Sequence, residues 1–109
     1  MKKLILAGLI ALTAGAASAS NNYAACDSYG QLGKAAAELR DKGDPFHKTL
    51  AFYMDTLYSS PNWNENTATQ KKIKETNAYS ILSDAYYTFK YHNPDEVYDS
   101  ILLKCLRGY

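Results

Sequence analysis

Apolar side chains recur at intervals of three and four residues along most of the chain beyond residue 20, which is the spacing of amphipathic helices. Glycine, proline and short polar stretches divide this pattern into four segments. We predict helices over about residues 24–42, 44–58, 67–91 and 93–107. Strict alternation of apolar and polar residues, the pattern of a half-buried strand, is absent. The pattern therefore predicts an all-α fold.

Each predicted helix has an apolar face that would turn toward the others. The members of these faces are Cys26, Tyr29, Leu32, Gly33, Ala36 and Leu39; Phe46, Leu50, Tyr53, Met54, Leu57 and Tyr58; Ile73, Ala78, Ile81, Leu82, Ala85 and Phe89; and Val97, Tyr98, Ile101, Leu102 and Cys105. Four tyrosines widen the apolar stripe of the third helix, so this helix is either central or part of an interface. The weakly helical pair Thr76 and Asn77 is a point at which this helix could be interrupted.

Turn residues mark the connection between the first and second helices, and another marks the end of the fourth helix. Asp44 is a favourable N-cap residue, and Pro45 suits the first helical position. Gly43 follows the first helix and Gly108 follows the fourth, and glycine at such positions commonly ends a helix.

Two capping boxes predict where the third and fourth helices begin. Thr67 and Gln70 have the spacing at which the two side chains cap each other's backbone N–H groups. Asn93, Pro94 and Glu96 combine an N-cap, a proline at the first helical position and a capping-box glutamate. Every boundary signal in the chain is therefore typical of helices.

The two cysteines of the chain, Cys26 and Cys105, lie near the start of the first helix and the end of the fourth. In an up-down-up-down bundle these two ends are neighbours. We therefore predict a small four-helix bundle of this topology, with one disulfide that joins the first and last helices. Closing so long a loop would remove about 4–5 kcal/mol of unfolded-state entropy in the chain-entropy model.

The N-terminus has the three parts of a signal peptide. Lys2 and Lys3 form a positive start, residues 4–12 are apolar apart from one glycine, and the small residues 17–19 suit a signal peptidase. We predict cleavage after Ala19. The mature protein would then be periplasmic or secreted, in an oxidising compartment that permits the disulfide.

Cleavage would separate a signal peptide over residues 1–19 from a single helical domain over residues 20–109, with no stable membrane insertion of that domain. Two alternatives stay open. The apolar run could remain as an uncleaved anchor, although it is shorter than the roughly 20 residues that span a bilayer. Residues 23–26 could also form a lipoprotein acylation site, but Tyr23 is bulky where such sites usually carry leucine.

The charge of the predicted domain excludes an electrostatic binder of nucleic acid. The chain has 12 basic and 11 acidic residues, and two of the basic ones, Lys2 and Lys3, belong to the predicted signal peptide. The remaining charge is close to neutral, so no basic surface for nucleic acid or for an anionic membrane is expected.

No motif indicates an enzyme or a metal site. The chain lacks GxSxG, P-loop and dinucleotide-binding patterns, and we predict no catalytic residue, no enzyme activity and no cofactor. His47 and His92 would lie at one end of the bundle with Asp44, Asp95 and Glu96, a set that could bind a metal or sense pH. Because these acids are already explained as residues of helix starts, we predict no metal and two solvated histidines.

Aromatic side chains are more numerous than a small bundle buries: ten tyrosines, three phenylalanines and one tryptophan. Tyrosine is enriched at protein interfaces because it offers a large contact area and a polar tip. Tyr53 and Tyr58 on the second helix are secondary candidates for an interface. The main candidate interface residues are Tyr79, Tyr86, Tyr87, Tyr91 and Trp63. The equal alternative is a core edge at which each hydroxyl faces water.

Trp63 stands out because it is the one large apolar residue in the polar loop over residues 59–66. It could close the end of the bundle as a plug, or it could protrude and anchor a partner. Of the two positions, the plug is the one that we favour.

A short series of residues carries a resemblance to known proteins. The series is Cys26, Ala35-Ala36, Arg40-Asp41, Gly43, Ala85-Tyr86 and Cys105. With it the chain resembles small exported single-disulfide helical proteins of Gram-negative bacteria and their prophages. The resemblance covers nearly the whole predicted domain but departs at residues 63–76, where the connection is long. It implies an exported helical fold and brings no activity with it.

Three hypotheses of function follow. The first is a non-enzymatic, periplasmic or secreted protein-binding module that acts on another protein as an inhibitor or an immunity-type protein. Immunity proteins against type-six secretion amidase toxins share its size, export and helical class. The second is an acid- or envelope-stress periplasmic chaperone, a group that also contains small helical proteins with one disulfide. The third is a structural, envelope-associated protein that forms a homodimer through the third helix.

Overall fold

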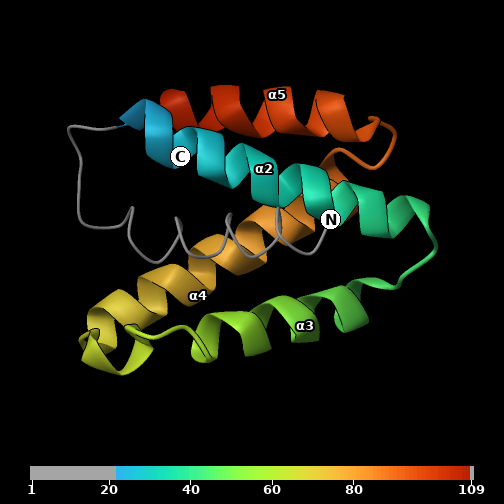
Figure 1. Cartoon of the computed structure of the whole chain (residues 1–109). Helices are drawn as coiled ribbons and strands as arrows, with labels where there is room; N and C mark the ends of the chain where they lie inside the picture. The colour runs from blue at the N-terminus through green and yellow to red at the C-terminus, as the bar shows by residue number, and fades with distance from the viewer. Residues whose placement is uncertain (1–21, 109) are drawn as a thin grey trace.

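Four α-helices follow one another along the computed structural model, which describes residues 22–108 (Figure 1). No strand occurs among these residues. A short 3₁₀ helix precedes the third α-helix, and a π-helical turn continues it. The elements are α2 (Asn22–Asp41), α3 (Phe46–Tyr58), η1 (Trp63–Glu65), α4 (Ala68–Ser83), η2 (Asp84–Thr88) and α5 (Pro94–Leu106).

Successive helices run in alternating directions, which confirms the predicted up-down-up-down bundle (Figure 1). Helix α2 is central: it lies along α5 for most of its length and also contacts α3, α4 and η2. Helix α3 packs mainly against α4. The bundle therefore consists of a tightly paired α2–α5 layer and an α3–α4 hairpin.

The predicted disulfide is present. Cys26 near the start of α2 bonds to Cys105 near the end of α5, with 5.4 Å between the Cα atoms and 79 residues between them in sequence. The bond therefore joins the first and last helices at the end of the bundle where α2 begins and α5 ends.

Small residues explain how α2 and α5 approach so closely. A Cβ atom on Gly33 would overlap the side chain of Ile101, and one on Gly30 would lie 2.7 Å from the ring of Tyr98. The hydroxyl of Tyr98 also donates a hydrogen bond to the carboxylate of Asp27 on α2. This bond raises the pKa of the Tyr98 phenol, because it stabilises the protonated form.

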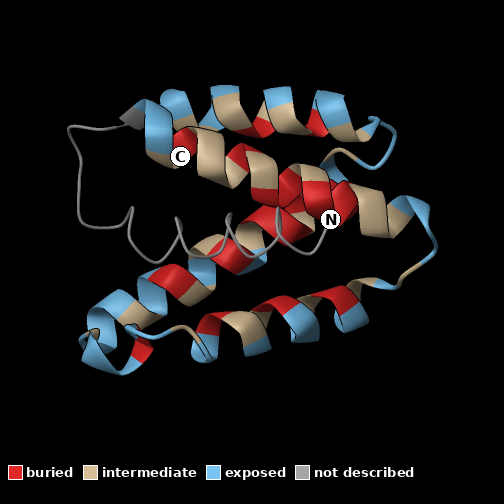
Figure 2. Cartoon of the chain, in the orientation of Figure 1, coloured by how far each residue is buried: buried red, intermediate tan, exposed pale blue. Residues whose placement is uncertain are grey.

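The core lies where the apolar faces of all four helices meet (Figure 2). Tyr53, Leu57, Ile101 and Val97 have no exposed surface, and Leu32 fills the centre from α2. Burying side chains of this size contributes about 1.5–3 kcal/mol each before entropy is subtracted. The predicted apolar faces of α2, α3 and α5 supply most of the observed core, and the exception is Tyr58 at the end of α3, which is 44% exposed.

The capping signals mostly act as predicted. The side chains of Thr67 and Gln70 each bond to the other's backbone N–H, at 3.1 and 2.9 Å. Asn93 and Glu96 form the same pair at 2.9 Å in both directions. Gly43 and Gly108 follow α2 and α5 with φ of 92° and 96°, a backbone conformation that favours glycine.

The predicted N-cap of α3 is wrong. Pro45, and not Asp44, occupies the cap position, and no side chain caps this helix. The carbonyl oxygen of Pro45 accepts the first helical bonds, from the backbone N–H groups of Lys48 and Thr49. Asp44 instead contributes its own carbonyl oxygen to a contact with η2, described below.

The third helix differs from the prediction in which residue lies on its buried face and in where it ends. Ile73 is 47% exposed, whereas Lys74 is 4% exposed and takes the position four residues before Ala78 on the buried face. Thr76 and Asn77 do not interrupt α4. The α-helical hydrogen-bond pattern ends at Ser83 and is followed by the π-helical turn η2, so the helix does not continue to residue 91.

Lys74 is accommodated because its ammonium group donates to Oδ1 of Asn66 at 2.6 Å. Asn66 in turn donates to the carbonyl oxygens of Asn62 and Trp63 and so holds the η1 turn. Burial lowers the pKa of Lys74.

The predicted signal peptide, residues 1–19, lies outside the described residues, as does Tyr109. Within residues 22–108, none of the helices has the length together with the apolar content that crossing a bilayer requires.

Candidate protein-binding site

The π-helical turn η2 carries two of the candidate tyrosines, Tyr86 and Tyr87, and continues the helix that carries Tyr79. The backbone N–H of Phe89 donates to the carbonyl oxygen of Asp84, five residues earlier, at 2.7 Å. In a regular α-helix that N–H would reach Ala85 instead. The carbonyl oxygen of Ala85 is therefore released for a partner outside the helix. Turns of this kind are often found at functional sites.

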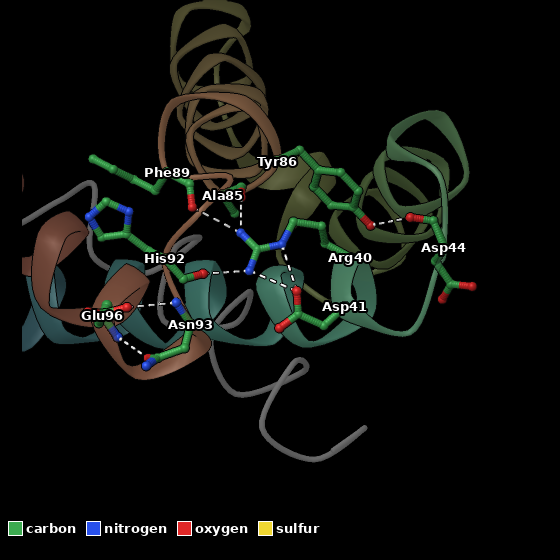
Figure 3. A network of polar contacts seen from close by, with 9 residues as sticks. All are labelled: Arg40, Asp41, Asp44, Ala85, Tyr86, Phe89, His92, Asn93 and Glu96. Carbon is green, nitrogen blue, oxygen red and sulfur yellow. Dashed lines mark hydrogen bonds and ion pairs between the residues drawn. The ribbon is translucent and has the colours of Figure 1, made fainter.

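Arg40 on α2 supplies that partner (Figure 3). Its Nη1 donates to the carbonyl oxygens of Ala85 at 2.7 Å and Phe89 at 3.0 Å, and its Nη2 donates to that of His92 at 2.6 Å. Asp41 binds the outer edge of the same guanidinium group at 2.9 Å. Only 12% of the Arg40 side chain is exposed. One side chain therefore fixes η2 and the connection to α5 relative to α2.

Tyr86 points inward from η2 and is 9% exposed. Its hydroxyl donates to the carbonyl oxygen of Asp44 at 2.8 Å and lies 2.7 Å from Oγ1 of Thr49. A phenol has one proton to donate, so Thr49 is the donor in the second bond. Burial raises the pKa of the Tyr86 phenol. This corrects the prediction that Tyr86 belongs to an interface: it attaches α3 to η2 from within.

Tyr79 and Tyr87 remain at the surface, and both contact the ring of Phe46. Their rings lie 5.8 and 5.1 Å from the Phe46 ring, measured between centroids, and the buried Tyr86 ring lies 5.5 Å from it. Tyr79 is 52% exposed and Tyr87 is 58% exposed. We call Phe46, Tyr79 and Tyr87 the aromatic patch. It joins the start of α3 to the end of α4 and the adjacent π-turn.

The other predicted interface residues lie apart from this patch. Tyr91 in the connection to α5 is 87% exposed, and the ammonium group of Lys90 lies 4.9 Å from its ring centroid. Trp63 is 9% exposed and packs against Tyr58, with 5.2 Å between ring centroids. Trp63 thus has the position expected of a plug, and it offers little surface to a partner.

The two secondary candidates on α3 differ from each other. Tyr58 is 44% exposed, and its hydroxyl donates to a carboxylate oxygen of Glu75 at 2.6 Å. Tyr53 is fully buried, and its hydroxyl has no hydrogen-bond partner among the described residues. Burial raises the pKa of Tyr53 strongly. Neither residue belongs to the aromatic patch.

Phe46 is the residue of the patch that sequence analysis did not single out. Its position on the apolar face of α3 indicated a core residue, and it is in fact half-buried among three tyrosine rings. No local signal distinguishes it from Leu50 or Met54, because its neighbours come from another helix.

The histidines do not form a metal centre with the acids near them. Within the described part of the chain, no group of three or more His, Cys, Asp or Glu side chains could hold a metal ion. His47 and His92 are both exposed. Asp95 forms an ion pair with Lys34 at 3.0 Å, and Glu96 is engaged in its capping box.

The comparisons with known proteins identify no relative. No family model matches this chain, no curated protein matches it, and no solved structure matches it. The site is therefore interpreted from its own geometry.

Proposed function

We propose that this protein is a non-enzymatic protein-binding module, and that the aromatic patch is the surface with which it contacts its partner. The observation that carries the proposal is the pair of half-exposed tyrosines, Tyr79 and Tyr87, that both contact Phe46. Aromatic side chains dominate the energetics of protein interfaces when they are fixed before binding.

Several contacts support the view that this patch is preorganised. Arg40 fixes η2 through three backbone carbonyl groups, and Tyr86 joins η2 to α3 directly beneath the patch. Phe46 then restricts both exposed rings from one side. Binding would therefore cost little side-chain entropy.

The compartment belongs to the same proposal. A signal peptide over residues 1–19 would export the chain, and the Cys26–Cys105 disulfide suits an oxidising compartment such as the periplasm or the exterior. The proposed role there is inhibition of, or immunity against, another exported protein.

The test replaces both exposed tyrosines of the patch, as Tyr79→Ala with Tyr87→Ala, and compares the variant with Tyr23→Ala. Tyr23 lies near the start of α2 and is 63% exposed, so it controls for the loss of an exposed ring elsewhere. Wild type and control should retain the same stoichiometric partner from an extract of the exporting host. The patch variant should bind that purified partner at least about 30-fold more weakly, since two anchor residues are lost.

Equal binding by the patch variant would contradict the site while leaving a binding function in place. Failure of wild type to retain any stoichiometric partner would contradict the function itself. Circular dichroism of each variant checks that the helices are intact.

A further inference from the structure

The outer face of α5 is a second surface with an unusual composition. The helix turns Val97 and Ile101 toward α2, while Asp99, Leu103 and Arg107 follow one another at four-residue spacing on the opposite side. All three are exposed, with Leu103 at 50%, and the nearby Leu106 is 44% exposed. An apolar centre is thus flanked by one acid and one base.

The two flanking charges have no partner among residues 22–108. Asp95 pairs with a lysine of α2 at 3.0 Å, and Lys104 pairs with a carboxylate of η2 at 2.8 Å. Asp99 and Arg107, by contrast, make no ion pair or side-chain hydrogen bond with any described residue. The sequence places them symmetrically, four residues before and four residues after Leu103.

We infer that a second copy of this chain covers this face, through an antiparallel pairing of the two α5 helices that cross at Leu103. A two-fold axis at Leu103 brings Asp99 of each copy to the level of Arg107 of the other, so one contact creates two opposite-charge pairs. Isologous interfaces of this type are the commonest in homo-oligomers. A parallel pairing would instead place like charges side by side. Antiparallel helices also oppose their dipoles favourably.

A groove beside this face adds to the surface that a second copy can cover. It has a volume of about 480 Å³, and Phe89 and Ser100 line it together with Leu103 and Arg107. Even so, one pair of short helices lies at the low end of specific interfaces, below about 1,200 Å² in total. The dimer is therefore weak and depends on protein concentration.

This dimer leaves the proposed partner surface accessible. Helices α5 and α3 lie on opposite sides of the molecule, with α2 and α4 between them (Figure 1). The two aromatic patches would then face away from the dimer axis, one on each copy. The dimer does not rest on the proposed function, and it uses a different helix from the third-helix pairing considered from the sequence.

Analytical ultracentrifugation over a concentration series tests the inference. The wild type should show a reversible monomer–dimer equilibrium that weakens with added salt. Leu103→Asp should weaken association at least about tenfold, because it places two carboxylates at the two-fold axis. The matched control is Ile73→Asp on α4, where the isoleucine is 47% exposed, and it should leave the equilibrium unchanged.

A charge exchange provides the sharper test. Asp99→Arg alone, or Arg107→Asp alone, should weaken the dimer about tenfold or more, since each places like charges opposite one another. The double exchange should restore wild-type association, because the pairs re-form with their signs reversed. A monomer at every concentration, a double exchange that fails to restore association, or a dimer unaffected by Leu103→Asp would each overturn the inference.

Discussion

Two buried tyrosines, Tyr53 on α3 and Tyr86 on η2, have opposite effects on stability. The hydroxyl of Tyr86 is bonded to Thr49 and to the backbone of Asp44, whereas the hydroxyl of Tyr53 has no partner among the described residues. Oε1 of Glu38 is likewise buried without a partner. A buried polar atom without a partner costs about 1–3 kcal/mol. The same functional group is therefore stabilising at one position and costly at the other.

Removing each hydroxyl separately should reveal this difference. Tyr86→Phe should lower the free energy of unfolding by about 1–3 kcal/mol, because it leaves Thr49 and a backbone carbonyl without their partner. Tyr53→Phe should leave the free energy unchanged or raise it by up to about 1 kcal/mol. Urea unfolding followed by circular dichroism measures both, and equal losses in the two variants would contradict the assignment.

At the scale of elements, the sequence predicts where the third and fourth helices begin better than it predicts the buried face and the end of the third helix. The capping boxes at Thr67 and Asn93 are local, since each involves residues three positions apart, and both were predicted correctly. The π-turn at η2 is not local: its released carbonyl group is satisfied by Arg40, 45 residues away in sequence. The burial of Lys74 was not predicted for a related reason. Packing against the other helices, and not the polarity of each residue, determines which face of α4 is buried.

The dependence of η2 on Arg40 can be measured directly. Arg40→Lys retains the charge but cannot span three carbonyl groups, since a lysine carries a single ammonium group. We expect the free energy of unfolding to fall by about 2–3 kcal/mol. Amide exchange should also accelerate over residues 85–92, where the carbonyl groups are held.

The matched control is Arg107→Lys, the same chemical change at the exposed arginine that directly follows α5. It should alter the free energy of unfolding by less than about 0.5 kcal/mol. Equal losses of stability in both variants, or slow amide exchange over residues 85–92 in Arg40→Lys, would show that the hydrogen bonds of Arg40 do not hold η2 in place.

At the scale of the whole molecule, the disulfide and the small residues of α2 organise the fold around the α2–α5 pair. The bond connects residues 79 apart, so it constrains almost the entire described chain when unfolded. Gly30 and Gly33 permit the close contact that the bond reinforces. The hairpin of α3 and α4 packs against this layer through the shared core. Hydrogen bonds also join the two layers, from Arg40 on α2 to the η2 continuation of α4 and from Asn77 on α4 to Tyr29 on α2.

Replacing both cysteines, as Cys26→Ala with Cys105→Ala, should lower the free energy of unfolding by about 2–5 kcal/mol. The urea midpoint measures this loss, and wild type treated with a reducing agent should show a similar one. Equal midpoints with and without the bond would contradict the stabilising role given to the disulfide.

The sequence by itself determined the helical class, the number and order of the helices, and the pairing of Cys26 with Cys105. These features depend on periodicity, on caps that act over three residues, and on a topology that brings the chain's ends together. Only the tertiary structure decided which tyrosines are accessible. Tyr86 is buried and Tyr87 exposed although they are adjacent, because the π-turn and its contacts with Arg40 set the direction of each side chain, and those contacts come from distant parts of the chain.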